Sequence, residues 1–190
     1  MSTREHLHGV VARLQPVVQG VPSGSLGSPT PCTDWDVRHL ASHLLGTTDA
    51  MRRIGAGEEL DRDDPWGTSG QELDDTWRDR LSDRLIALAD AWHAPEASEG
   101  DALDGAVPRE DLGDMALLEV LLHGWDLARA TDQDLEVDDA AAEHALELLD
   151  KHGEAGRAQG AFCAPVEVDD EAPLLDRVVA AAGRDPGWGR

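Results

Sequence analysis

The chain has 190 residues, of which 41% are apolar, and this length and composition suit one compact domain spanning 1–190. Its formal charge of −23, from 39 acidic and 16 basic residues, opposes contact with phosphate backbones and anionic lipid headgroups, so we expect no nucleic-acid and no membrane partner. The N-terminus lacks the apolar run of a signal peptide, and no stretch approaches the ~18 apolar residues of a membrane span, so we expect a cytoplasmic protein.

Two helices are predicted in the first third of the chain. Apolar residues recur at helical spacing over 3–19, and the prolines and glycines that follow end this helix. The second helix is predicted to open at 33–36, Thr-Asp-Trp-Asp, because a hydroxyl and a carboxylate three residues apart are typical of a capping box. Its apolar face begins with Val37, Leu40 and Leu44. The glycine-, aspartate- and proline-rich segment from about 55 to 68 indicates a loop.

Three longer helical patterns and one short one follow this loop. A second capping-box pattern at 69–72, Ser-Gly-Gln-Glu, predicts the start of a third helix, whose inner stripe ends at Trp92. The fourth helix follows Pro108, carries acidic residues in its first turn and runs to about Ala130. A shorter helix is predicted over about 138–152, with Gly153 and Gly156 loosening the chain after it, and a brief helical run is predicted over 173–182.

The pattern as a whole predicts an all-α fold. No alternating strand pattern and no internal repeat is found in the sequence. We therefore expect a four-helix bundle over about 3–152 with a long crossover and a short extra helix, followed by a C-terminal tail over about 153–190. Facing helices of such a bundle can build a metal site at the core.

The main clue to function is a carboxylate and an imidazole on the apolar stripe of the fourth helix. Glu119 and His123 are four residues apart, so they lie on the same helical face. A buried carboxylate needs a charge partner or a metal, and Glu with neutral His are suitable ligands for Zn²⁺ or a similar ion. A catalytic site needs a third ligand: His43, beside Leu44 on the second helix, is favoured over His39. The alternative is a buried ion pair without metal.

Two tryptophans and two cysteines are further candidates for a functional role. Trp35 and Trp125 stand beside the candidate site, where they would either wall a substrate or cofactor pocket or fill the core. Cys32 and Cys163 are predicted to be free thiols, because they are too few and too far apart for a disulfide framework. The dipole of the second helix can lower the pKa of Cys32, but the favoured interpretation is a small buried hydrophobic residue.

Two runs of the sequence resemble a known family. Residues 29–44, PTPCTDWDVRHLASHL, and 119–131, EVLLHGWDLARAT, are similar to the two signature blocks of the actinobacterial maleylpyruvate isomerase N-terminal, or DinB-like, metal-binding family. The ending at 162–166, 176–177 and 183–188 resembles the single-domain branch of that family. The resemblance therefore extends over nearly the whole chain.

This resemblance implies a DinB-like four-helix bundle that holds a divalent metal, Zn²⁺, Ni²⁺ or another, through His43, Glu119 and His123. It also implies that the metal binds mycothiol or another small thiol, which reacts with an electrophilic substrate in an isomerisation or an S-transfer. The isomerase itself carries a further C-terminal domain, whereas here only some forty residues follow the predicted bundle. Maleylpyruvate isomerisation itself is therefore not expected.

Two other functions fit the same residues. A metal-dependent hydrolase would use a metal-bound water as nucleophile and would need no thiol. A non-catalytic metal- or thiol-binding module would use the ion only structurally. Pairing through an exposed helical face would give a homodimer in any of the three cases.

Overall fold

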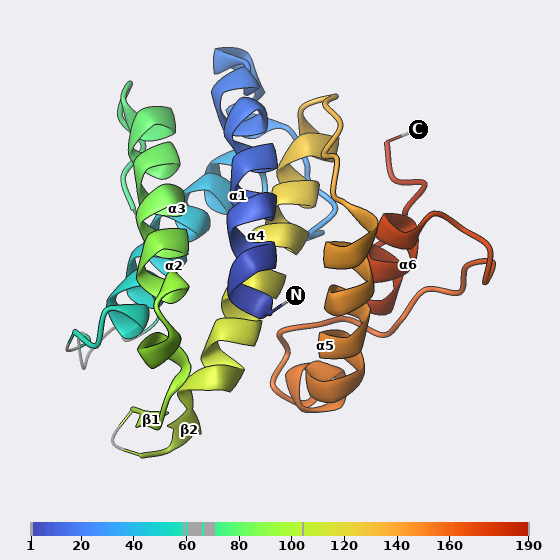
Figure 1. The fold of residues 1–190 in the computed structure, drawn as a ribbon. Coiled ribbons are helices and arrows are strands. Elements are labelled where there is room, and N and C mark those ends of the chain that lie inside the picture. Colours follow the sequence, from blue (N-terminus) through green and yellow to red (C-terminus); the bar gives the residue numbers. More distant parts are fainter. Residues whose placement is uncertain (1, 59, 61–65, 67–70, 104, 190) are drawn as a thin grey trace.

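The computed structural model describes residues 2–58, 60, 66, 71–103 and 105–189. Four helices form the bundle: α1 Thr3–Gly20, α2 Val37–Gly55, α3 Trp77–His93 and α4 Arg109–Ala130. Each helix packs on two others in the cyclic order α1, α3, α2, α4. Helix α5 Asp139–Ala158 lies against one side of the bundle, next to α1 and α4, and α6 Leu174–Ala181 packs on α5 (Figure 1). The fold class is thus the predicted one, an all-α bundle with additional helices.

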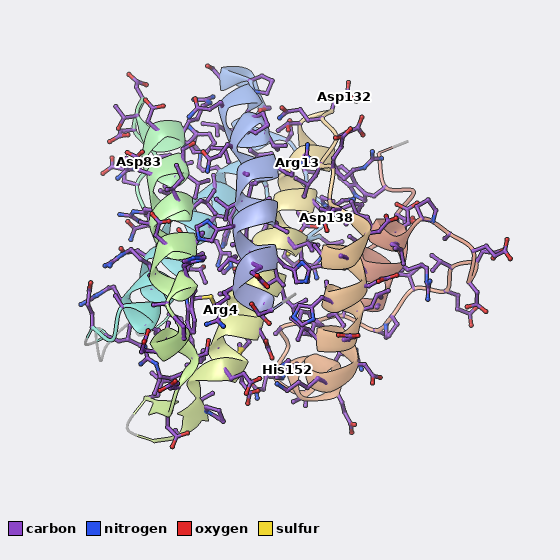
Figure 2. All side chains as sticks on the ribbon, viewed as in Figure 1. Arg4, Arg13, Asp83, Asp132, Asp138 and His152 are labelled. Atoms are coloured by element: carbon purple, nitrogen blue, oxygen red, sulfur yellow. The ribbon has the colours of Figure 1, made fainter. Side chains whose placement is uncertain are left out.

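Short elements connect the main helices. Two 3₁₀ helices span Ser23–Gly27 and Pro95–Ser98, and strands β1 Asp101–Ala102 and β2 Val107–Pro108 form an antiparallel pair just before α4. Among the described residues, no helix combines the length and the apolar character needed to cross a bilayer. Acidic side chains such as Asp83 and Asp132 are exposed and project outward from the helices (Figure 2).

Helix α4 lies at the centre of the molecule. It packs on α1 and α2 inside the bundle and on α5 outside it, so apolar side chains are buried on nearly every face. This explains why its apolar residues form long runs, such as Ala116–Leu118 and Val120–Leu122, rather than a narrow stripe. A polar side chain on α4 therefore enters the interior in almost any direction, and Glu119, His123 and Asp126 do so.

The predicted start of α2 is wrong. The helix begins at Val37, and its N-cap is Asp36, whose carboxylate accepts a hydrogen bond from the backbone N–H of His39 at 2.8 Å. The residues before Asp36 form a separate turn, in which the buried Thr30 hydroxyl bonds to the backbone oxygens of Cys32 and Trp35. An aspartate directly before the apolar stripe is thus the effective cap, and the threonine at 33 is outside the helix.

The predicted start of α3 is also wrong. Ser69 and Gly70 of the expected capping box lie outside the described residues, and the helix begins at Trp77. Gln71 is tied to α2 instead, because its backbone N–H and C=O both bond to the Ser42 hydroxyl, at 2.7 and 2.8 Å. The Asp74 carboxylate accepts from the N–H and hydroxyl of Thr76. These side-chain bonds to the backbone hold a turn where the sequence pattern predicted a helix.

Helix α5 is longer than predicted, since it continues through both glycines to Ala158. Each glycine permits a close contact: a Cβ at Gly153 would lie 2.9 Å from Arg157 Nη1, and one at Gly156 would lie 2.5 Å from Phe162 Cδ2. The glycines therefore serve packing rather than helix termination, and the tail begins later than expected. The short helix predicted in the tail is present as α6.

Candidate metal centre

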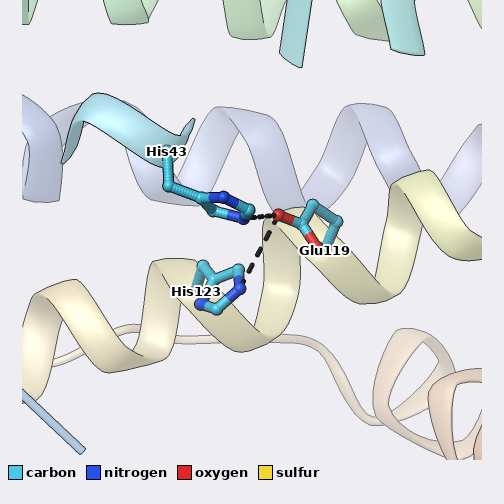
Figure 3. A group of neighbouring side chains, drawn as sticks. All are labelled: His43, Glu119 and His123. Atoms are coloured by element: carbon cyan, nitrogen blue, oxygen red, sulfur yellow. Dashed lines mark hydrogen bonds and ion pairs between the residues drawn. The ribbon is translucent and has the colours of Figure 1, made fainter. Parts of the chain in front are cut away.

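His43 of α2 and Glu119 and His123 of α4 converge between the two helices (Figure 3). Glu119 Oε1 lies 2.5 Å from His43 Nε2 and 3.6 Å from His123 Nε2, and one ligand atom from each residue lies within 4.8 Å of the other two. The structure thus brings together the three side chains that the sequence analysis selected. His39, the alternative, is exposed and does not belong to this cluster.

Helical geometry explains the convergence. Glu119 and His123 are one turn apart on α4, and α2 packs directly against this face. On α2, His43 precedes the buried Leu44 and lies one turn before Thr47, whose hydroxyl donates to the His43 carbonyl at 2.7 Å. The imidazole is thereby placed at the edge of the core, where its Nε2 atom can reach Glu119.

A buried chain of contacts orients His123. Its Nδ1 atom lies 2.9 Å from Asp126 Oδ2, so Nδ1 carries the hydrogen that this bond requires and Nε2 is left facing Glu119. Asp126 has no exposed surface, and its carboxylate also accepts from Arg184 Nη2 at 3.1 Å and from Arg184 Nε at 3.4 Å. A carboxylate on the far nitrogen is the usual support of a metal-binding histidine, because it fixes the ring and raises its basicity.

The two tryptophans differ in their relation to the cluster. The half-buried ring of Trp35 lies against His39, His43 and His123, with centroid separations of 4.7, 4.6 and 5.4 Å. Trp125 is 4% exposed and belongs to the hydrophobic core. Trp35 therefore covers the candidate ligands, whereas Trp125 fills the interior.

The electrostatics of the cluster favour a cation beside Glu119. Burial opposes ionisation of this carboxyl, but the charge of His123 and the hydrogen bond with His43 outweigh burial and hold its pKa at about 2. Burial likewise disfavours a charged His123, but Glu119 and Asp126 raise the pKa of its imidazole. The carboxylate is therefore ionised at neutral pH and is balanced by positive charge, which a proton on His123 or a metal ion can supply.

The donor set fits a divalent metal. Two imidazole nitrogens and one carboxylate oxygen form a known catalytic zinc set that leaves one coordination position open. Bonds of about 2.0–2.2 Å in a tetrahedral arrangement separate the ligand atoms by roughly 3.3–3.6 Å. The His123–Glu119 separation already has this value, and the 2.5 Å His43–Glu119 contact would have to widen by less than about 1 Å. Since one ligand atom of each residue lies within 4.8 Å of the other two, side-chain shifts of roughly 1 Å are what a tetrahedral site requires.

A cavity of about 230 Å³ adjoins the cluster. It lies between α4, α5 and the segment after α5, with Glu119, His123 and Arg184 at one end and Asp111 and His152 at the other. A small molecule in this cavity would contact the candidate ligands directly. The arrangement thus combines a possible metal centre with space for a reactant.

A second group of potential ligands, Asp111, Asp114 and His152, occupies the α4–α5 interface. The ammonium of Lys151, the single lysine of the chain, lies 2.8 Å from Asp111 Oδ1 and 2.9 Å from Asp114 Oδ2. Burial opposes ionisation of Asp114, but hydrogen bonds from Lys151, His152 and Thr3 outweigh it and lower the pKa of the carboxyl. Lysine supplies the cation here, so this cluster is an ion-pair network that joins two helices.

One feature of the site was not identified from the sequence. Arg184, the buried partner of Asp126, lies 58 residues later and has no local pattern that marks it. Cys32 is not activated, in agreement with the favoured interpretation of the sequence: burial first, and then the charge of Asp126, raise the pKa of its thiol to about 11. The helix dipole therefore does not produce a reactive thiolate at this position, and both cysteines are free.

Comparisons with known proteins agree with this architecture. Residues 7–128 match the family model of the mycothiol maleylpyruvate isomerase N-terminal domain. Two uncharacterised proteins of Mycobacterium tuberculosis, one from each of two strains, are each 27% identical over 175 residues, which is 88% of this chain and 90% of theirs.

Crystal structures of the mycothiol-dependent maleylpyruvate isomerase and of a histidine-to-alanine mutant of it share the fold, with TM-scores of 0.67 and 0.66 at 18% identity. Each match covers 98% of this chain and 91% of the isomerase chain. Most of the isomerase chain therefore has a structural counterpart here. The chain belongs to the family of the mycothiol maleylpyruvate isomerase N-terminal domain.

Proposed function

We propose that the protein is a divalent-metal-dependent enzyme that uses mycothiol, or a similar small thiol, in an S-transfer or isomerisation reaction. The observation that carries the proposal is the convergence of His43 Nε2, Glu119 Oε1 and His123 Nε2 at the end of a cavity. The family match and the shared fold with a mycothiol-dependent enzyme support the choice of thiol chemistry.

A divalent ion held by these three residues would lower the pKa of a coordinating thiol, so that the thiolate forms near neutral pH. The residues of the chain prepare this position. Asp126 accepts the Nδ1 hydrogen of His123 and leaves Nε2 available. The hydrogen bond from His123 and the charge of Arg184 outweigh burial and keep Asp126 ionised in the interior. Trp35 lies over both imidazoles and restricts the access of water from that side.

Zinc stoichiometry tests the ligand set. We expect about one zinc per chain in tag-free wild-type protein, and loss of zinc in His123→Ala and His43→Ala. The matched control is His39→Ala, which removes a neighbouring imidazole outside the cluster and should retain zinc. Wild-type protein that cannot be loaded with zinc, or zinc loss in His39→Ala alone, would contradict the assignment.

Thiol dependence tests the reaction class. Electrophile turnover by the zinc-loaded protein is expected only when mycothiol is added, with bacillithiol and glutathione as comparison thiols. Turnover without any thiol would favour the hydrolase, in which water is the nucleophile. Stoichiometric zinc with no effect of any thiol on its coordination would favour a non-catalytic module.

A further inference from the structure

The cavity beside the candidate metal centre has a chemical character of its own. It follows one face of α4 from Asp111 to His123, a span of twelve residues, or about 18 Å along the helix. Most of its lining residues are apolar; Gln159 is polar and uncharged, and five lining residues within the described part of the chain are ionisable. The larger apolar lining residues are Met51, Met115, Leu118, Leu122 and Phe162.

Two features suggest that this cavity is formed for a ligand. Met115 is 37% exposed although it lies on the most buried helix of the molecule, and the surface it exposes lines the cavity. Phe162, the single phenylalanine of the chain, forms part of the opposite wall. Its ring lies so close to α5 that only a glycine fits at 156, where a Cβ would be 2.5 Å from the ring. An aromatic wall and a thioether face each suit an apolar ring.

The charges around the cavity disfavour an anionic ligand. Among the described lining residues, Arg184 is the only arginine or lysine, and its guanidinium already donates to Asp126 and to the Ala182 carbonyl. Glu119 and Asp111 contribute carboxylates, and the nearby Lys151 ammonium is held by Asp111 and Asp114. Of the two lining histidines, His123 faces Glu119 and Asp126, and His152 Nε2 lies 3.1 Å from Asp114 Oδ2. Apart from the proposed metal ion at one end, a carboxylate in the cavity would therefore lose its hydration without gaining a cation that is not already paired, which is costly.

The volume limits the ligand to a small molecule. An engineered apolar cavity of about 150 Å³ holds benzene, so the 230 Å³ here admits one ring with substituents. We propose that this cavity binds the electrophile of the reaction, and that the electrophile is a small, uncharged and largely apolar molecule. The identification of the ligand as the electrophile rests on the proposed thiol-transfer function, whereas the cavity and its preference for neutral ligands do not.

A binding experiment without thiol or added metal tests the cavity by itself. Two matched ligands, 1,3-dinitrobenzene and 3,5-dinitrobenzoate, differ by one carboxylate and can be compared by isothermal titration calorimetry. The neutral ligand should bind at least about tenfold more tightly than the anion, as expected for an unpaired charge entering an apolar site. Equal or tighter binding of the benzoate, or no measurable binding of either ligand, would overturn the proposal.

A variant that introduces a positive charge tests whether the ligands bind in this cavity. Met115→Arg places a cation in the cavity at a position open enough to tolerate it, and should reduce the neutral-over-anionic preference about tenfold or more. Ile86→Arg is the matched control, because Ile86 is an exposed apolar residue on α3, away from the cavity, and should keep the wild-type preference. Equal preferences in the two variants would show that the ligands bind elsewhere.

A turnover experiment separates this proposal from the function on which it rests. Zinc-loaded protein and mycothiol are given 1-chloro-2,4-dinitrobenzene or 4-chloro-3,5-dinitrobenzoate, and each rate is divided by the uncatalysed rate. The sulfur–carbon bond forms, the carbon–chlorine bond breaks, chloride leaves with the bonding electrons, and the thiol proton passes to the buffer. We expect the protein to accelerate the reaction of 1-chloro-2,4-dinitrobenzene at least about tenfold more than that of 4-chloro-3,5-dinitrobenzoate, because the neutral molecule binds more tightly.

Greater acceleration of the anion would overturn the substrate class. If the protein accelerates the reaction of neither aryl chloride but still binds 1,3-dinitrobenzene more tightly than 3,5-dinitrobenzoate, the result would contradict the proposed function while supporting the neutral-ligand cavity.

Discussion

Removal of Arg184 should weaken both the fold and the candidate metal centre, because His123 is the only other side chain among the described residues that forms a hydrogen bond with the Asp126 carboxylate. Arg184→Met keeps a long apolar side chain but eliminates two of the three side-chain hydrogen bonds to a carboxylate with no exposed surface. Removing one partner of a buried ion pair typically costs about 3–5 kcal/mol. Since His123 still balances part of the charge, we expect the lower value, about 3 kcal/mol, or a Tm decrease of roughly 6–12 °C.

The same substitution should lower zinc affinity. Without Arg184, nothing else in the described contacts holds Asp126 against His123, so the imidazole loses its fixed orientation. Loss of such a supporting contact usually costs about 10- to 100-fold in metal affinity. Urea denaturation gives the stability change, and competition with a chromophoric chelator gives the affinity. Arg184→Lys, which keeps the positive charge, should recover part of the stability and part of the zinc affinity that Arg184→Met loses.

A double-mutant cycle separates a buried-charge effect from a packing effect. If the loss in Arg184→Met reflects an uncompensated Asp126 charge, then Arg184→Met combined with Asp126→Leu should be less destabilised than the two single losses added together. Additive losses, or an Arg184→Met variant within about 0.5 kcal/mol of wild type, would refute the reasoning.

Three other consequences concern separate parts of the molecule. Trp92→Phe should lower the free energy of unfolding by about 2 kcal/mol, measured by urea denaturation, because the substitution removes side-chain volume and the 3.0 Å hydrogen bond from the buried indole to a backbone carbonyl. A change below about 0.5 kcal/mol would contradict this packing. Asp114→Asn should destabilise the protein by about 2 kcal/mol at pH 7. Because the folded pKa of Asp114 is lowered, its stabilisation is present above about pH 4 and is lost as the pH falls through the folded pKa. The deficit of the variant should therefore shrink below about pH 4, and a deficit that is unchanged at acidic pH would disprove the ionic contribution. Iodoacetamide at pH 8 should alkylate the exposed Cys163 at least about tenfold faster than Cys32, because burial raises the pKa of the Cys32 thiol to about 11. Peptide mass spectrometry measures the two alkylation rates, and equal rates would contradict the burial of Cys32.

Helical periodicity was sufficient to predict the bundle. The spacing of Leu7, Val10 and Leu14 predicts α1 almost to the residue, and the start of α4 follows from Pro108 and the acidic first turn. These signals are local, so they can be read from the sequence alone. The Glu119–His123 pair could be recognised for the same reason, because four residues on a helix fix a shared face.

Contacts between distant segments account for part of what the sequence analysis missed. The start of α3 depends on hydrogen bonds between Ser42 and Gln71, which are 29 residues apart. The length of α5 depends on Phe162 packing over a helical glycine, a contact that appears only when the chain turns back after the helix. Arg184 reaches Asp126 across 58 residues. None of these pairings leaves a periodic or capping signal in the local sequence.

The central claim is that His43, Glu119 and His123 hold a metal ion with one position open to a thiol. Absorption spectroscopy of the cobalt-substituted protein during titration with mycothiol tests it most directly. We expect tetrahedral cobalt bands at about one cobalt per chain and a new near-ultraviolet sulfur-to-cobalt band that saturates with one thiol and is absent in His123→Ala. A protein that takes up no cobalt, or a cobalt spectrum that mycothiol does not change, would contradict the account.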